Sequence, residues 1–183
     1  MYTLQVEDLP SYSYEDYCHW EGDWELIEGV PYAMAPAPIK IHQQLIGYLF
    51  KSIASEFDHC PDCEILIDED WKVNSYTVLK PDLSIVCGDS NPRYISKTPE
   101  VIFEVQSPST AKHDEGLKFR LYQEEKVKYY VLVYPKELLA KIYCLENGKY
   151  KKMAECDKDA FSFGSITCPF NLDFAEVFKR FRQ

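Results

Sequence analysis

The chain has 183 residues, of which 46% are hydrophobic and 15% aromatic, with 7 Gly and 11 Pro. This composition excludes a disordered or fibrous protein, and the length fits a single domain over residues 1–183 that buries a sizeable core. The formal net charge of −10 weighs against broad affinity for nucleic acid, because such affinity depends on lysine and arginine neutralising phosphates.

The first half of the chain predicts a short helix, a hairpin, a long helix and a strand. The helix covers 14–20, and the hairpin joins apolar runs over 24–27 and 30–35 through a Glu-Gly turn. Residues 39–57 form an amphipathic helix, because apolar side chains recur every four positions. An imperfect alternation over 64–73 predicts one strand that enters the core.

The centre of the chain predicts two neighbouring strands. Residues 82–87 become apolar after an acid, and residues 99–106 are dominated by β-branched and aromatic side chains. The turn-rich connection allows antiparallel pairing. Side chains alternate between the faces of a strand, so Ile102, Glu104 and Gln106 share one face of the second strand.

The last third predicts a helix over 113–126 and a continuous apolar strand over 129–134. A strand, helix, strand unit of this kind requires parallel strands in one sheet. We expect a second hairpin around Asn147-Gly148 and a final helix over 170–181. Together these elements indicate an α/β fold.

Cysteine usage and the chain start indicate the compartment. No apolar run approaches the roughly 20 residues of a membrane helix, and residues 1–7 lack the pattern of a signal peptide. We therefore expect a cytoplasmic protein that does not enter a membrane, with its seven cysteines reduced and no disulfide. Cys60 and Cys63 have the spacing of a zinc or redox pair, but no second pair follows at the spacing of a zinc site.

Two acids interrupt the central strands. Antiparallel pairing brings Asp82 beside Glu104 and Gln106, and two buried carboxylates repel unless one is protonated or a cation lies between them. Mg²⁺ and Mn²⁺ suit such a pair, since one or two carboxylates with waters complete an octahedron. The alternative is that both acids lie at exposed strand ends as ordinary polar residues.

The following helix carries a polar face. Asp114, Lys118 and Tyr122 recur every four residues and therefore project from one side, where Lys118 can lean over the carboxylates. The alternative role for Lys118 is a simple i,i+4 pair with Asp114.

Several motifs resemble the Uma2 branch of the PD-(D/E)XK nuclease superfamily. The resemblance rests on the following segments: Pro81-Asp82, Glu104-Val105-Gln106-Ser107-Pro108-Ser109-Thr110, Asp114, Lys118, Tyr122, Trp24 to Gly29, Met34-Ala35-Pro36, His42, and Tyr129 to Pro135. It implies a restriction-endonuclease-like core, with a mixed central sheet flanked by helices and added hairpins. It also implies that the Asp and the Glu hold a metal that activates water.

The resemblance adds two supporting residues and contains one departure. Glu25 and His42 belong by resemblance to the neighbourhood of the site, whereas an exposed strand glutamate and a structural histidine are the alternatives. Gln106 stands where the superfamily pattern has lysine. Lys118 is the candidate replacement for that missing cation.

We therefore expect a metal-dependent nuclease that uses Mg²⁺ or Mn²⁺, with nucleic acid, DNA first, as substrate. Asp82, Glu104, Gln106 and Lys118 would form its catalytic group. A nuclease fold that binds without hydrolysis is the first alternative, favoured by Gln106 and the acidic charge. A metal-free structural or dimerising protein is the second, and a homodimer is left open.

Overall fold

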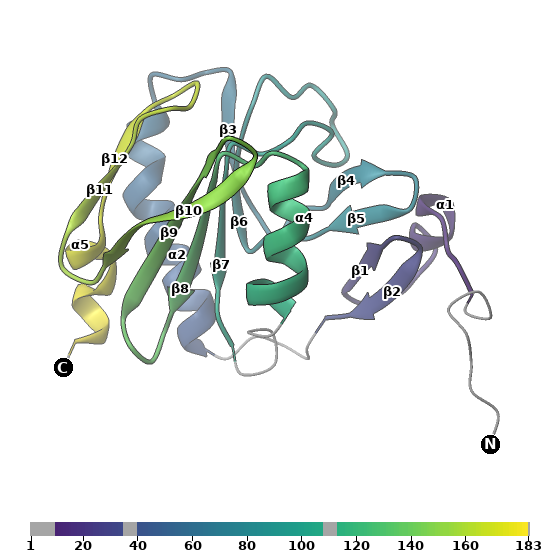
Figure 1. Cartoon of the computed structure of the whole chain (residues 1–183), viewed down its shortest axis with the longest axis horizontal. Coiled ribbons are helices and arrows are strands. Elements are labelled where there is room, and N and C mark those ends of the chain that lie inside the picture. Colours follow the sequence, from purple (N-terminus) through teal and green to yellow (C-terminus); the bar gives the residue numbers. More distant parts are fainter. Residues whose placement is uncertain (1–9, 35–39, 108–112, 183) are drawn as a thin grey trace.

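The computed structural model describes residues 10–34, 40–107 and 113–182. Its centre is a six-stranded mixed sheet in the order β10-β9-β8-β7-β6-β3 (Figure 1). The pair β7–β8 is parallel and the other neighbours are antiparallel, as the sequence predicts for the crossover and the two central strands. The strands are β3 (Cys63–Ile67), β6 (Leu83–Cys87), β7 (Val101–Val105), β8 (Tyr129–Tyr134), β9 (Leu139–Glu146) and β10 (Lys149–Cys156).

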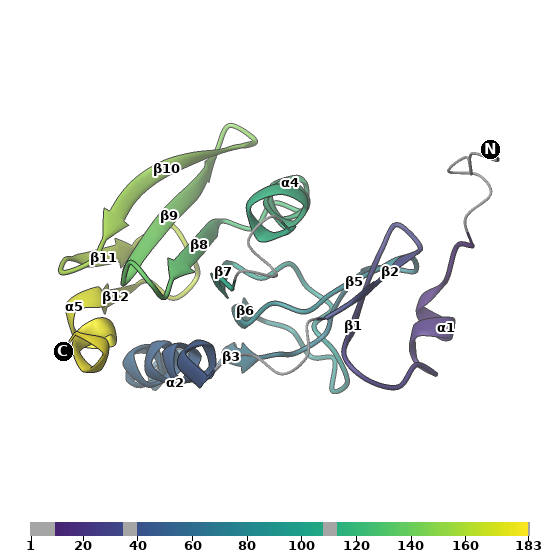
Figure 2. The ribbon, with the colours of Figure 1, turned by 90° about the horizontal axis from the view of Figure 1, so that it is seen from below.

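Helices cover both faces of this sheet. The long helix α2 (Lys40–Ala54) lies on one side together with α5 (Phe174–Phe178), and α4 (Phe119–Glu124) lies on the other (Figure 2). Helix α2 continues into the 3₁₀ turn η2 (Ser55–Phe57), and α5 continues into η4 (Lys179–Phe181). The expected mixed sheet flanked by helices is confirmed.

A second sheet packs beside α4. Its order is β2-β1-β5-β4, and α1 (Tyr14–Tyr17) lies at its outer end (Figure 1). The strands are β1 (Trp24–Ile27), β2 (Val30–Ala33), β4 (Trp71–Asn74) and β5 (Thr77–Leu79). The predicted hairpin is confirmed, with Glu28 and Gly29 at positive φ in its turn.

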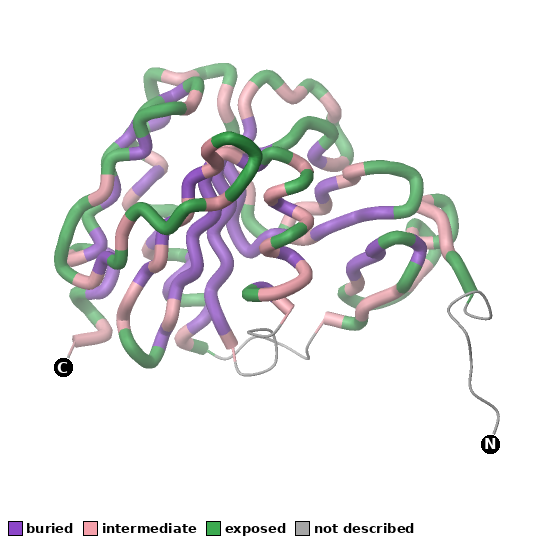
Figure 3. The backbone as a smooth tube through the Cα atoms, in the orientation of Figure 1, coloured by how far each residue is buried: buried purple, intermediate pink, exposed green. Residues whose placement is uncertain are grey.

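The strands β6, β7 and β8 run through the interior of the molecule (Figure 3). On the α2 face, Val101, Phe103 and Val105 join one apolar cluster with α2 and α5. On the α4 face, Ile102 joins another cluster with Trp71 and Tyr122. The predicted alternation of β7 is therefore confirmed.

Three predicted elements need correction. The single strand over 64–73 is wrong: β3 and β4 belong to different sheets, and Asp68 takes a positive φ between them. The final helix is shorter than predicted, because Phe170–Asp173 form strand β12, paired with the unpredicted β11 (Ala160–Phe163). The helix over 113–126 begins as the π-helical turn η3 (Asp114–Lys118) and continues as α4.

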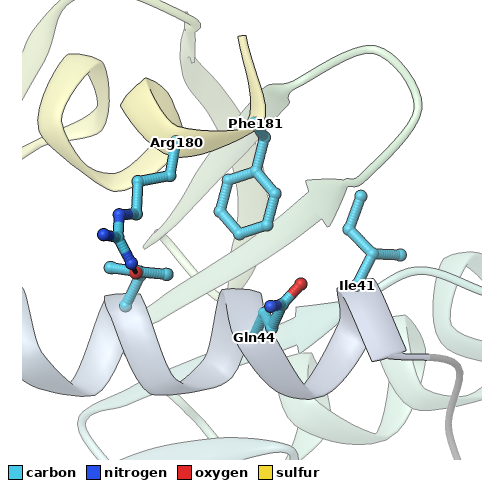
Figure 4. A pocket seen from close by; sticks show the side chains of 5 residues that line it. Ile41, Gln44, Arg180 and Phe181 are labelled. Atoms are coloured by element: carbon cyan, nitrogen blue, oxygen red, sulfur yellow. Dashed lines mark hydrogen bonds between the residues drawn. The ribbon is translucent and has the colours of Figure 1, made fainter. Parts of the chain in front are cut away.

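A pocket of about 450 Å³ lies between α2 and the C-terminal segment (Figure 4). Its wall consists of Ile41, Gln44, Tyr48, Arg180 and Phe181, and the Arg180 guanidinium donates to the Tyr48 hydroxyl at 2.7 Å. Within the described residues, no helix is long and apolar enough to cross a membrane.

The prediction that no disulfide forms is wrong for this structure. Cys60 is bonded to Cys168, and Cys63 is bonded to Cys87. Cys63 and Cys87 lie directly opposite each other on β3 and β6. Neither pairing follows a short sequence spacing, since the partners lie 108 and 24 positions apart, and the fold brings them together.

Candidate active site

The site begins where β6 and β7 meet. Leu83 pairs with Phe103, so Asp82, one residue earlier, lies opposite Glu104 in the same register. The Oδ2 atom of Asp82 accepts a hydrogen bond from the Val105 N–H at 2.7 Å. Both acids are buried, with residue exposures of 8% and 2%, so the alternative of exposed strand ends is excluded.

Glu104 projects toward the helix that follows β7. Its Oε1 atom accepts from the Lys118 ammonium at 3.0 Å and from the Tyr122 hydroxyl at 2.7 Å. Lys118 is itself only 2% exposed. The prediction that the Lys118 side chain reaches the carboxylate of Glu104 on β7 is therefore confirmed.

Glu25 enters from the second sheet. Its Oε1 lies 2.9 Å from the Lys118 ammonium and accepts from the Lys80 N–H at 2.8 Å. Its Oε2 lies 3.4 Å from Nε2 of His113. Glu25 is 1% exposed, so it is not an exposed strand glutamate, and it shares the Lys118 ammonium with Glu104.

The π-helical turn supplies the remaining groups. Asp114 Oδ1 lies 4.0 Å from the Lys118 ammonium, and Asp114 Oδ2 accepts from the Gln106 amide at 2.9 Å. The main-chain carbonyl of Asp114 accepts from the Tyr130 hydroxyl at 3.1 Å. Short π-helical turns inside α-helices are frequent at functional sites. Here the π-helical turn directs Asp114 and Lys118 toward the same cluster.

Negative charge is in excess in this cluster. One ammonium, Lys118, faces the carboxylates of Glu25, Glu104 and Asp114 within 4.0 Å. Burial lowers the pKa of Lys118, but Glu104 and Glu25 outweigh that effect and hold it well above its usual value. Lys118 therefore remains charged.

The two glutamates that share Lys118 differ in their proton affinity. Burial raises the pKa of Glu104 well above its usual value, and the charges of Asp82 and Asp114 add to this effect against Lys118. Burial also acts to raise the pKa of Glu25, but the charge of Lys118 and the hydrogen bonds from His113, Lys80 and Lys118 together outweigh it, and the pKa of Glu25 falls below its usual value. Glu104 is therefore the acid that most needs a proton or a further cation.

The donor atoms fit a small, hard divalent cation. Asp82 and Glu104 provide two carboxylates, and the buried Oε1 of Gln106 has no hydrogen-bond partner, so a third oxygen is free for a ligand. Across 10–34, 40–107 and 113–182, no group of three or more His, Cys, Asp or Glu side chains has a metal-binding arrangement. Mg²⁺ does not require one, since waters complete its shell.

Two histidines flank the cluster. Nε2 of His42, on α2, lies 3.1 Å from Asp82 Oδ2. Burial lowers the pKa of His42, but the hydrogen bond and charge of Asp82 outweigh burial and raise it. His113, next to Glu25, is a site residue that the sequence did not predict, because its contact with Glu25 joins distant parts of the chain. The structure joins six of the predicted site residues in one network of hydrogen bonds and ion pairs: Glu25, Glu104, Gln106, Asp114, Lys118 and Tyr122. Asp82 and His42 form a separate pair, which meets this network at the Val105 N–H beside Glu104.

Comparisons with known proteins identify the family of this chain. The family model Uma2, described as "Putative restriction endonuclease", matches residues 12–164. The Synechocystis protein named "Uncharacterized protein slr1290" is 34% identical over 123 residues, which cover 62% of this chain and 63% of that protein's length.

A solved structure shares the fold. It is described as a "putative nuclease belonging to DUF820 from Anabaena variabilis", and it matches with a TM-score of 0.72 and 13% identity. The match covers 91% of this chain and 97% of that one. The family match spans most of the sequence and includes the strands and helices that hold the polar cluster, so the chain belongs to the Uma2 family.

Proposed function

We propose that this protein is a metal-dependent nuclease that hydrolyses phosphodiester bonds, with DNA as the first substrate class to test. The observation that carries the proposal is the excess of buried carboxylates around Lys118, where β6 and β7 pair. The description of the family, and that of the Anabaena structure as a nuclease, support the same chemistry.

Asp82 and Glu104 would hold Mg²⁺ or Mn²⁺, and the buried amide oxygen of Gln106, which has no hydrogen-bond partner, is a candidate third ligand. When bound, the ion would supply Lewis acidity and a water of lowered pKa. In the reaction the water oxygen bonds to phosphorus while one phosphorus–oxygen ester bond breaks. The water loses a proton to solvent, and the departing oxygen gains one.

Lys118 provides the positive charge that Gln106 lacks. A neutral amide orients water or accepts a hydrogen bond, but only a cation offsets the charge that develops on the phosphoryl oxygens. Lys118 contacts Glu104 at 3.0 Å, so it lies beside the reacting centre. Glu25 also contacts the ammonium, at 2.9 Å, and acts as a positioning residue.

His42 acts through Asp82. Its Nε2 hydrogen bond at 3.1 Å fixes the orientation of the carboxylate. Partners of this kind tune a ligand without binding the metal themselves, and their loss typically lowers metal affinity 10–100-fold.

A binding module without hydrolysis is the second candidate, and the pairing of Lys118 favours it. Lys118 already contacts two carboxylates and is 2% exposed, so a phosphate must displace one of those contacts to reach it. In that case the chain would bind nucleic acid and leave it intact.

Cleavage assays with Mn²⁺ and Mg²⁺ on single- and double-stranded DNA and RNA separate the candidates. The nuclease should cleave at least one form, require the metal, and lose activity in Glu104→Ala. The matched control is Glu64→Ala, an exposed strand acid that should keep full activity. Metal-independent binding without cleavage of any form would favour the second candidate, and full activity in Glu104→Ala would exclude the proposed site.

A further inference from the structure

Four cysteines from three distant segments of the chain lie together at one end of the central sheet. This is the end of β6 opposite Asp82. Cys60 lies on the turn between η2 and β3, Cys63 begins β3, Cys87 ends β6, and Cys168 precedes β12. Their Cα separations are 3.9 Å for Cys63 and Cys87, and 6.3 Å for Cys60 and Cys168. We propose that, in the reduced protein, these four thiolates form a closed structural zinc site.

The first observation is the shape of the Cys60-to-Cys63 turn. The Cys63 N–H donates to the Cys60 carbonyl at 3.0 Å, so both side chains emerge from one tight turn. The Gly88 N–H donates to the Asp62 carbonyl at 2.6 Å, which holds the tip of this turn against the residue after Cys87. A Cys-x-x-Cys turn is a common half of a structural zinc site.

The second observation is that Glu100 links the segment of Cys87 to the segment of Cys168. Glu100 Oε2 lies 3.7 Å from Cys87 Sγ and accepts from the Thr167 N–H at 2.8 Å. Glu100 Oε1 also accepts from the Thr167 hydroxyl. Since Thr167 is adjacent to Cys168, this carboxylate holds Cys168 close to Cys87 independently of any sulfur–sulfur bond.

The chemistry of the four sulfurs selects the metal. Four thiolates are soft ligands in a tetrahedral set, which suits Zn²⁺ and does not suit Mg²⁺ or Ca²⁺. Two thiolates on one zinc ion lie about 3.8 Å apart when each Zn–S bond is about 2.3 Å. Within each of the two pairs, the Cα separations of 6.3 and 3.9 Å allow the side chains to rotate to that sulfur separation once the sulfurs are no longer bonded.

The disulfides and the zinc site are two states of the same side chains. While the sulfurs are paired they cannot ligate, in keeping with the lack of a metal-binding group among the described residues. A dithiol reductant gives each disulfide two electrons and two protons and is itself oxidised to a disulfide. Binding of one Zn²⁺ by the four resulting thiols then releases four protons.

The site would be structural. It joins the edge strand β3, the end of the core strand β6 and the loop between β11 and β12, whose Phe163 and Phe170 pack in the α2-side core. No open coordination position remains for a substrate when four cysteines bind one ion. The inference is independent of the proposed nuclease function.

The test uses the full chain purified with a dithiol reductant and without chelators. Elemental analysis should find about one zinc per chain, the content of a single closed site. Replacement by Co²⁺ should give the intense visible bands of tetrahedral thiolate coordination. Absence of both metals from the reduced, folded chain would overturn the proposal, as would a protein whose mass remains lower by four hydrogens under these conditions.

Matched variants locate the ligands. Cys168→Ser and Cys60→Ser should weaken zinc retention against a competing chelator by more than about 100-fold, because loss of an outer partner alone can reach that factor. Cys156→Ser, a buried free cysteine, and Glu104→Ala should leave the Co²⁺ bands unchanged. Equal retention in Cys168→Ser and Cys156→Ser would contradict the assignment. The metal content and Co²⁺ spectrum of the unmodified chain remain decisive if a serine variant does not fold.

Discussion

The two faces of β7 are built for different purposes. Toward α2, Val101, Phe103 and Val105 enter a continuous apolar cluster. Toward α4, Ile102 is followed by Glu104, and the apolar cluster gives way to buried acids, a lysine and tyrosine hydroxyls. One five-residue strand thus separates a face whose packing stabilises the fold from a face whose charges destabilise it unless they are compensated.

The strongest test of this contrast uses neighbouring residues. Phe103→Ala removes a fully buried ring and should lower the free energy of unfolding by about 3–5 kcal/mol. Glu104→Gln keeps the shape and removes one of the excess negative charges, so the stability of the metal-free protein should stay equal or rise. Chemical denaturation of both variants measures the difference.

Mn²⁺ binding should rank these two variants in the opposite order to their stability. Glu104→Gln should lose Mn²⁺ binding by calorimetry, whereas the folded fraction of Phe103→Ala should retain it. A large loss of stability in Glu104→Gln, with Mn²⁺ affinity unchanged, would show that this acid is structural.

Lys118 tests how the charged face is held together. Lys118→Ala leaves Glu25 and Glu104 buried without their shared cation and should cost about 3–5 kcal/mol of stability. If the protein is an active nuclease, the rate should fall about 10²-fold or more, with Mn²⁺ affinity equal or higher.

Rescue from the neighbouring strand position separates charge from fold. Gln106→Lys in the Lys118→Ala background should restore part of the rate, because it returns a cation to the end of β7. Lys152→Ala, an exposed lysine, is the matched control and should have no effect. Full activity in Lys118→Ala would rule out this lysine as a phosphoryl stabiliser.

The sequence predicts the apolar face more completely than the polar one. Alternation in residues 99–106 fixes which side chains share a face, because the side-chain period of a strand does not depend on its partners. The pairing of Lys118 with Glu25 could not be predicted, since it requires the second sheet to pack beside α4. His113 was missed for the same reason: its contact with Glu25 spans 88 positions in the chain.

Long-range pairing also limited the prediction of the strands and the cysteines. The alternation over 64–73 continues across Asp68, whose positive φ ends β3 before β4 joins a different sheet. Nothing local to Cys60 indicates Cys168, 108 positions away. Local period and turn chemistry therefore predicted elements, whereas the contacts between elements required the fold.

The two faces of β7 should also differ in how their stability depends on pH, because the charged face includes contacts of Glu25. Its folded pKa is lowered, so its stabilising contribution is complete above its unfolded pKa, about 4.3, and is lost as the pH falls through the folded value. Glu25→Gln should cost about 1–3 kcal/mol near neutral pH and flatten the loss of stability below about pH 4.

Denaturation curves between neutral and acid pH measure this difference. Glu64→Gln removes an exposed acid from β3 and should keep the wild-type acid profile. An acid profile of Glu25→Gln that matches the wild type would mean that the Lys118 contact does not lower the pKa of Glu25.

The smallest expected effect comes from one hydroxyl on the charged face. Burial, together with the charge of Glu104, raises the pKa of Tyr122 well above its usual value, so its hydroxyl stays protonated and donates to Glu104 at 2.7 Å. Tyr122→Phe should cost only about 1 kcal/mol, because Glu104 Oε1 still accepts from Lys118 and is not left unpaired. Mn²⁺ affinity should fall about tenfold, since the hydroxyl orients a proposed ligand.

Tyr130→Phe is the matched control: it loses a hydroxyl that donates to the main-chain carbonyl of Asp114, so its stability should fall by a similar amount while its Mn²⁺ affinity stays unchanged. Calorimetric titration of both variants measures the difference, and equal Mn²⁺ affinities would show that Tyr122 serves packing on this face and does not orient Glu104.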